Sequence, residues 1–173
     1  YLFLQDVVSQ PAQPTGFPIT WVNLSGGSVA ADYEMDPAVT TDPLYASLMI
    51  DSLRSLPTLS IVTDQDSLFS QASGIYSNPT LDTVAWERAA SVEWINADGT
   101  TAFQIDAGLR IQGGPYFRSP SMTNKHSFRL LFKEEYGATK LKYPVFGTDE
   151  GVAQEFDTIT LRANANDGYS WAP

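Results

Sequence analysis

Half of the basic residues of this chain fall between Ala107 and Lys133, a stretch that contains no acidic residue. The chain as a whole has 20 acidic and 10 basic side chains and a net charge of −10. The basic residues of the stretch are Arg110, Arg118, Lys125, Arg129 and Lys133, and the only histidine, His126, lies among them. Such a cluster predicts a surface that attracts anions. The alternative is a solvated strand face whose cations pair with acids on neighbouring strands.

The same stretch has the pattern of two strands joined by a loop. Apolar and polar residues alternate in Phe103–Gln112 and again in His126–Lys133, the period of half-buried strands. The segment between them holds two glycines and two prolines, which break strands. We therefore expect two adjacent antiparallel strands and a loop from Gly113 to Asn124.

The rest of the sequence indicates a mainly antiparallel β-sheet of about five strands with one clear helix, an α+β arrangement. The helix is predicted to begin at Asp42-Pro43, since Asp caps helices and Pro suits the first helical position, and to end before Pro57. Further strands are predicted at Thr58–Thr63, Trp86–Ile95 and Phe156–Ala163. The predicted core residues are Leu59, Ile61, Val92, Trp94, Ile105, Leu109, Ile111, Phe128, Leu130, Phe132, Ile159 and Leu161.

The domain organisation is predicted from composition. Residues 1–20 are interpreted as the end of a preceding module, with a terminal strand at Tyr1–Val8, followed by a proline-rich linker. Residues 21–173 form the main domain, and Trp21–Met35 is expected to be irregular structure folded over the next element.

Composition excludes several kinds of chemistry. Without cysteine the chain forms no disulfide, and with one histidine it forms no Cys/His zinc site. His126 is on the apolar side of its strand, which favours a structural role over a catalytic triad. No apolar run reaches membrane-spanning length. A pI near 4.3 argues against nucleic-acid binding.

Seven short segments occur in an order that resembles the CotH family, the spore-coat CotH-like kinases and their relatives in large secreted bacterial proteins. The similar region covers Leu56 to Trp171. The segments are Thr58–Asp64, Leu68-Phe69, Gly74–Tyr76, Trp86–Arg88, Gly108–Gly114, Lys125–Leu130 and Phe156–Ala163.

The resemblance implies the amino-terminal portion of an atypical protein kinase-like fold. Family members are expected to bind ATP with Mg²⁺, to phosphorylate Ser or Thr of a partner protein, and to lie outside the bacterial cell or on its surface. The metal-binding and catalytic acids of the family lie further toward the carboxyl terminus. The chain alone is therefore expected to be inactive, and no catalytic or metal-binding residue is assigned within it.

Within this resemblance the hairpin is predicted to contact the phosphates of the nucleotide. A glycine loop lets backbone N–H groups approach an anion, and an adjoining lysine supplies a point charge. The predicted contacts are Lys125, Arg110, Arg129, Gly113, Gly114 and Ser119. If the strands pair, Arg110 and Arg129 share the Lys125 side of the sheet. The alternative for Lys125 is a solvated residue at the start of a strand.

Two features depart from the family pattern. Pro115, Tyr116 and Phe117 follow the glycines where smaller, polar residues are expected. Asn164 stands where relatives often carry glycine. Asn166 and Asp167, by contrast, match the family's Asn-Asp pair and could line the site, although Asp167 also suits a simple turn after a strand. A second hypothesis of another class is a non-catalytic, β-rich surface module that binds carbohydrate or protein.

Overall fold

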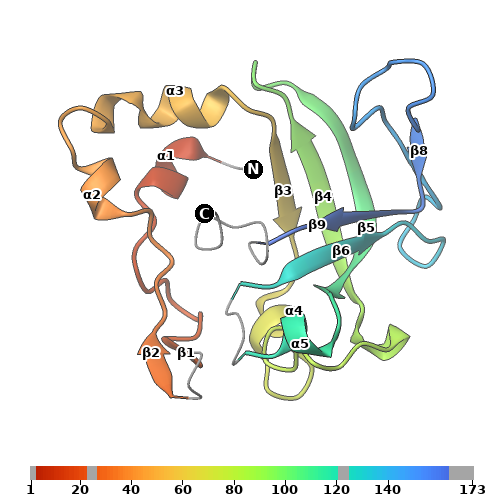
Figure 1. Cartoon of the computed structure of the whole chain (residues 1–173), viewed down its shortest axis with the longest axis horizontal. Coiled ribbons are helices and arrows are strands. Elements are labelled where there is room, and N and C mark those ends of the chain that lie inside the picture. Colours follow the sequence, from red (N-terminus) through yellow and green to blue (C-terminus); the bar gives the residue numbers. More distant parts are fainter. Residues whose placement is uncertain (1–2, 23–26, 121–124, 164–173) are drawn as a thin grey trace.

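The centre of the fold is a five-stranded antiparallel sheet with the strand order β3-β4-β5-β6-β9. The structure, a computed structural model, describes residues 3–22, 27–120 and 125–163. The strands of this sheet are β3 (Thr58–Val62), β4 (Arg88–Ile95), β5 (Thr101–Gln112), β6 (Ser127–Leu131) and β9 (Thr158–Leu161). The sheet is strongly twisted, since β3 and β4 run steeply in Figure 1 whereas β6 and β9 run across the view. The predicted α+β class, mainly antiparallel β, is confirmed.

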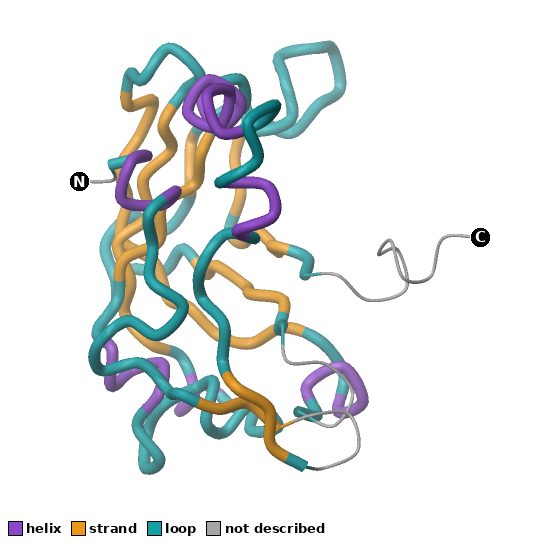
Figure 2. The backbone as a smooth tube through the Cα atoms, turned by 90° about the vertical axis from the view of Figure 1, so that its left-hand side faces the viewer, coloured by secondary structure: helices purple, strands orange, loops and turns teal. Residues whose placement is uncertain are grey.

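Shorter elements surround this sheet. Five short helices are described: α1 (Leu4–Val8), α2 (Pro37–Thr40), α3 (Met49–Arg54), α4 (Gln65–Phe69) and α5 (Pro115–Arg118). Two small antiparallel sheets pair β1 (Thr20–Val22) with β2 (Ser28–Ala30) and β7 (Leu141–Lys142) with β8 (Glu155–Phe156). Helices α1 to α3 and the β1–β2 hairpin lie together beside the large sheet (Figure 1), and Figure 2 shows the molecule from that side.

The predicted strand pair is confirmed. Strands β5 and β6 are antiparallel neighbours, with Leu109 opposite Leu130 and Arg110 opposite Arg129. The described part of the intervening segment is not loop throughout, because α5 forms within it. Pro115 occupies the first turn of this helix, where a missing N–H costs no hydrogen bond.

The predicted core is confirmed on the central strands and is less buried at the edges. Val92, Leu109, Ile111, Leu130 and Phe132 are each at most 3% exposed. The other seven predicted residues are half-buried. Four of these seven lie on β3 and β9, the edge strands, whose apolar faces have a neighbouring strand on one side only.

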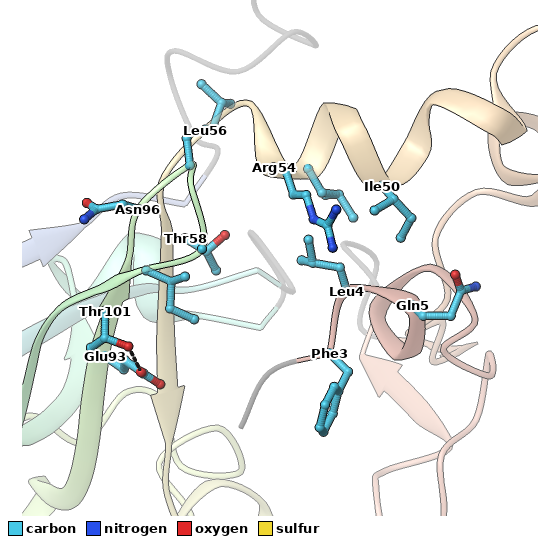
Figure 3. Close-up of a pocket in the computed structure, with 14 residues that line it drawn as sticks. Phe3, Leu4, Gln5, Ile50, Arg54, Leu56, Thr58, Glu93, Asn96 and Thr101 are labelled. Carbon is cyan, nitrogen blue, oxygen red and sulfur yellow. Dashed lines mark hydrogen bonds between the residues drawn. The ribbon is translucent and has the colours of Figure 1, made fainter.

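Two predictions for the amino-terminal region are wrong. The segment predicted as a terminal strand contains helix α1, whose Leu4 lies beside Ile50 and Arg54 of α3 (Figure 3), so packing between helices overrides the strand-like composition. The segment predicted as irregular contains the β1–β2 hairpin. The centroid of its Trp21 ring lies 5.9 Å from that of Tyr76, so the hairpin packs against the segment that follows α4.

The predicted helix is shorter than expected. It consists of α3, preceded by a 3₁₀ turn at Ala46–Leu48. The Asp42 side chain accepts the N–H of Leu44 at 2.7 Å and so caps a turn, not the helix. The same Asp-Pro signal does begin a helix six residues earlier, where Asp36 Oδ1 accepts the Ala38 N–H at the start of α2.

Candidate functional site

The register of the hairpin places two arginines directly opposite each other on the polar face of the sheet. Arg110 of β5 faces Arg129 of β6, which confirms that the two residues share one face. Like charges in directly opposed positions destabilise a sheet. Lys125, which precedes β6, is exposed. This pairing concentrates positive charge where the sequence predicts an anion-binding surface.

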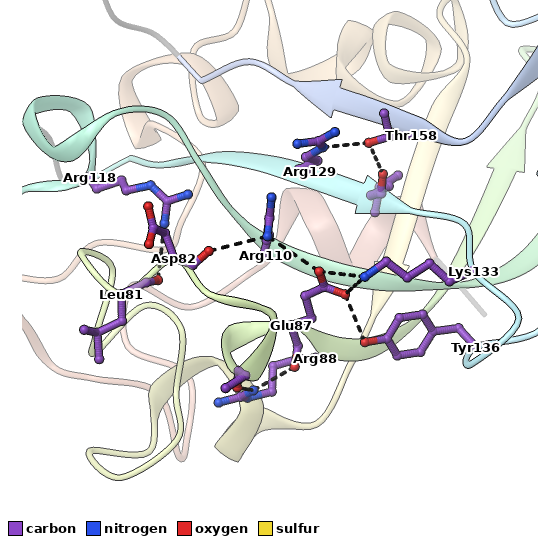
Figure 4. Close-up of polar contacts among 12 residues, drawn as sticks. Leu81, Asp82, Glu87, Arg88, Arg110, Arg118, Arg129, Lys133, Tyr136 and Thr158 are labelled. Atoms are coloured by element: carbon purple, nitrogen blue, oxygen red, sulfur yellow. Dashed lines mark hydrogen bonds and ion pairs between the residues drawn. The ribbon is translucent and has the colours of Figure 1, made fainter. Parts of the chain in front are cut away.

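A buried carboxylate neutralises part of this charge. The side chain of Glu87 is 1% exposed, and its oxygens accept hydrogen bonds from Lys133 Nζ at 2.6 and 2.9 Å (Figure 4). Arg110 Nη1 lies 3.5 Å from Glu87 Oε1, and the Tyr136 hydroxyl donates to Oε2 at 3.4 Å. We call Glu87, Arg110, Lys133 and Tyr136 the Glu87 cluster. Sequence reasoning missed this cluster, although the position of Glu87 just before β4 places it near Arg110 once β4 and β5 pair.

A glycine makes room for the tyrosine of the Glu87 cluster. A Cβ atom added to Gly108 would lie 2.5 Å from a ring carbon of Tyr136, so the ring packs directly on the backbone of β5. Burial, and then the charge of Glu87, raise the pKa of Tyr136 to about 12. Tyr136 is therefore a neutral donor to Glu87 at physiological pH.

Arg118, another base of the predicted cluster, has a structural role. It is 4% exposed, its Nε donates to the carbonyl of Gly113, and its Nη1 donates to the carbonyl of Leu81 at 3.2 Å. Gly113 has φ +126°, a conformation that residues with a side chain rarely adopt. Arg118 therefore fastens α5 to the segment before β4 and fixes the shape of the glycine loop.

Arg129 contacts a hydroxyl group of the neighbouring strand. Its Nε donates to Thr158 Oγ1 on β9 at 2.9 Å (Figure 4), and no carboxylate of the described chain forms an ion pair with it. Of the three cations Arg110, Arg129 and Lys133 on this face, Arg110 and Lys133 share the carboxylate of Glu87, and Arg129 forms no ion pair among the described residues.

The remaining predicted site residues lie at the two ends of α5 or outside the described residues. Gly114 is the N-cap residue before α5, and a Cβ added there would meet no atom of the described residues within 4 Å. Ser119 is the C-cap residue after α5 and is half-buried. Residues 121–124 of the loop, and Asn166 and Asp167, lie outside the described residues.

The acids near the hairpin do not form a metal site. Asp106 lies opposite Ser91, where it lines a shallow groove of about 520 Å³ on the polar face together with Asp64 and Glu135. Within residues 3–22, 27–120 and 125–163, no group of three or more His, Cys, Asp or Glu residues could hold a metal ion. On their own, the described residues therefore supply no site with three protein ligands for Mg²⁺.

A separate cleft of about 530 Å³ lies between α1, α3 and the turn that joins β4 to β5 (Figure 3). Its acid, Glu93, accepts the hydroxyl of Thr101 at 2.7 Å, and Arg54 is its basic residue. None of the residues predicted to bind phosphate lines it, so the cleft is not part of the hairpin site.

His126 is buried at the base of the loop, in line with the structural role predicted for it. It is 5% exposed, and its ring centroid lies 5.1 Å from that of Tyr76. Its Nδ1 has no hydrogen-bond partner among the described residues. Burial lowers the pKa of His126, and the charge of Arg118 lowers it further, against an opposing hydrogen bond to the Phe117 backbone.

This burial makes stability depend on pH. The folded state binds a proton on His126 less readily than the unfolded state, whose histidine pKa is about 6.5. The contribution of neutral His126 to the free energy of unfolding should thus be fully present above about pH 6.5 and should be lost as the pH falls below that value. Urea unfolding at about pH 7.5 and about pH 5.5 measures the difference. In the His126→Gln variant the difference should shrink, and an unchanged difference would assign it to other groups.

No family model, curated protein or solved structure matches this chain. Membership of the CotH family therefore stays a prediction from the order of the sequence motifs. Among the described helices, none combines the length and apolar character needed to cross a bilayer.

Proposed function

We propose that the polar face of the β5–β6 hairpin binds the phosphates of a nucleotide. The observation that carries the proposal is the register of the hairpin, which places Arg110 directly opposite Arg129, while no acid of the described residues pairs with Arg129. An anion placed between the two guanidinium groups would relieve their repulsion and accept charge-assisted hydrogen bonds from both. Phosphate groups suit such a site because guanidinium groups bind them with two parallel N–H donors.

The neighbouring loop supports the same assignment. A Cβ added to Gly114 would meet no described atom within 4 Å, which leaves room for a ligand near the backbone, and the exposed Lys125 precedes β6, the strand paired with β5. We further propose that the chain is the amino-terminal, nucleotide-binding part of a CotH-like secreted bacterial kinase. Its longer parent would phosphorylate Ser or Thr of a partner protein with ATP and Mg²⁺.

The charges of the site also limit what this part of the protein can do. Glu87 competes with phosphate for Arg110 and Lys133, so we expect weak, salt-sensitive nucleotide binding. Phosphoryl transfer also needs carboxylates to hold Mg²⁺ and another to orient the acceptor hydroxyl. The described residues contain no group of three or more side chains that could hold a metal ion. We therefore expect this chain alone not to transfer phosphate. Robust transfer of labelled γ-phosphate by the isolated chain would contradict the expectation that the catalytic acids lie outside it.

The test is nucleotide binding by calorimetry with ATP in the absence of Mg²⁺. The Arg129→Ala variant should bind about tenfold more weakly, the effect of one charge-assisted hydrogen bond. Arg54→Ala, which removes an exposed arginine from the separate cleft, is the matched control and should bind like the unchanged chain. The affinity should also decrease as NaCl rises from about 50 to about 200 mM. Equal affinities in the two variants would remove the hairpin from nucleotide binding.

A second function is favoured by one observation. Tyr116 and Phe117 of α5 are 57% and 37% exposed, and the centroids of their rings lie 5.1 Å apart. Exposed aromatic rings suit the apolar faces of sugars, as a carbohydrate-binding surface module would require. Tyr116→Ala should then weaken binding to an oligosaccharide array, whereas the nucleotide hypothesis predicts no dependence of array binding on Tyr116.

A further inference from the structure

The apolar face of the large sheet contains a cavity that the phosphate site does not use. Its volume is about 280 Å³. Leu59, Trp94 and Phe103 form part of its wall on the sheet, and Leu141, Val145 and Phe146 cover it from the β7 region. These wall residues lie on the face opposite to Arg110 and Arg129, so one small ligand cannot contact both.

Among the described residues, no charged side chain lines the cavity. Thr160 is the polar residue that lines it, and the indole N–H of Trp94 already donates to Asn96 Oδ1 at 3.2 Å. A charged ligand would lose its hydration without gaining a partner. The lining therefore selects uncharged, apolar molecules.

The size of the cavity restricts the ligand further. An apolar cavity of about 150 Å³ stays dry and accepts benzene. The present cavity has almost twice that volume, which suits a two-ring aromatic molecule or a medium-length alkyl chain. Phe146 is 68% exposed while it also lines the cavity, so it marks a route of entry from solvent.

We propose that this cavity is a binding site for an uncharged apolar molecule the size of naphthalene or octanol. Burial of the apolar ligand surface would drive binding. Val92 and Leu130, which line the cavity and are each 1% exposed, offer apolar contact for the ligand. This site is independent of the phosphate site and goes beyond the proposed function.

The experiment follows methyl resonances of the full chain by NMR during titration with octanol, naphthalene and octanoate. Octanol and naphthalene should shift the methyl signals of Leu130 and Ile159, which line the cavity, and leave those of Val29 on β2 unchanged. Octanoate should bind at least about tenfold more weakly than octanol, since its carboxylate has no partner.

Two variants reduce the space. Ile159→Phe and Val145→Phe each place a ring in the cavity, from β9 and from the covering segment, and each should weaken octanol binding at least about tenfold. If one variant fails to fold, the other still tests the site. Leu56→Phe, outside the cavity and 69% exposed, is the control and should bind normally. The proposal is overturned if octanol and naphthalene shift no lining methyl, or if the folded filling variant binds octanol unchanged.

Discussion

Replacing Glu87 with alanine should lower the free energy of unfolding by about 2–4 kcal/mol. The substitution leaves Lys133 and Arg110 without their shared carboxylate and the Tyr136 hydroxyl without its acceptor. Breaking a fully buried pair costs about 3–5 kcal/mol. The expected value here is smaller because the Lys133 side chain is 35% exposed and water can replace part of the lost interaction.

Urea unfolding measures this change, and two comparisons isolate its cause. Glu135→Ala removes an exposed acid from the same region and should change stability by less than about 0.5 kcal/mol. Glu87→Gln combined with Lys133→Met should be more stable than the sum of the single changes predicts, because the double variant removes both charges of the Glu87–Lys133 pair. A loss below about 1 kcal/mol in Glu87→Ala would mean that the Glu87 cluster does not stabilise the fold.

The hairpin could be predicted because two independent signals agree there. The alternation of apolar residues assigns a face to each strand, and the glycines and prolines between the strands fix where they end. Together these signals place Arg110 and Arg129 on one face before any coordinates are known. The structure adds their register, which makes them direct partners.

Glu87 was missed because its partner depends on a register that the turn alone does not give. Strand β4 pairs Trp94 with Phe103 but Ile95 with Thr101, so a bulge shifts the register by one residue next to the turn. Counting from the turn would place Glu87 opposite Leu109. The shifted register, in which Arg88 is opposite Leu109, extends to place Glu87 opposite Arg110. The apolar pattern contained this information, because only the shifted register matches Trp94 with Phe103 on one face.

The amino-terminal helices were harder to predict because their conformation depends on contacts between distant segments. Helix α1 has five residues and α3 has six, too short to be stable alone, so packing of one on the other decides their structure. The role of Arg118 likewise depends on contacts between distant segments. Sequence reasoning could count Arg118 among the cations, but only the fold shows that backbone carbonyls bind it.

Truncating Leu130 to alanine should lower the free energy of unfolding by about 2–5 kcal/mol. Leu130 is 1% exposed on the inner strand β6, packs in the main core and also lines the apolar cavity. The change removes apolar contacts and enlarges an existing cavity that the rigid sheet cannot close, so both the transfer and the cavity contributions oppose folding.

Reversible urea unfolding of Leu130→Ala, compared with Leu56→Ala, measures that cost. Leu56 is the same residue type but 69% exposed, so its truncation should change stability by less than about 0.5 kcal/mol. The slope of the free energy against urea should stay the same in both variants, since neither changes the surface that unfolding exposes by much. If Leu130→Ala costs less than about 1 kcal/mol, the apolar face of β6 does not form the core. Such a small loss would also mean that Leu130 is not part of the wall of the proposed ligand cavity.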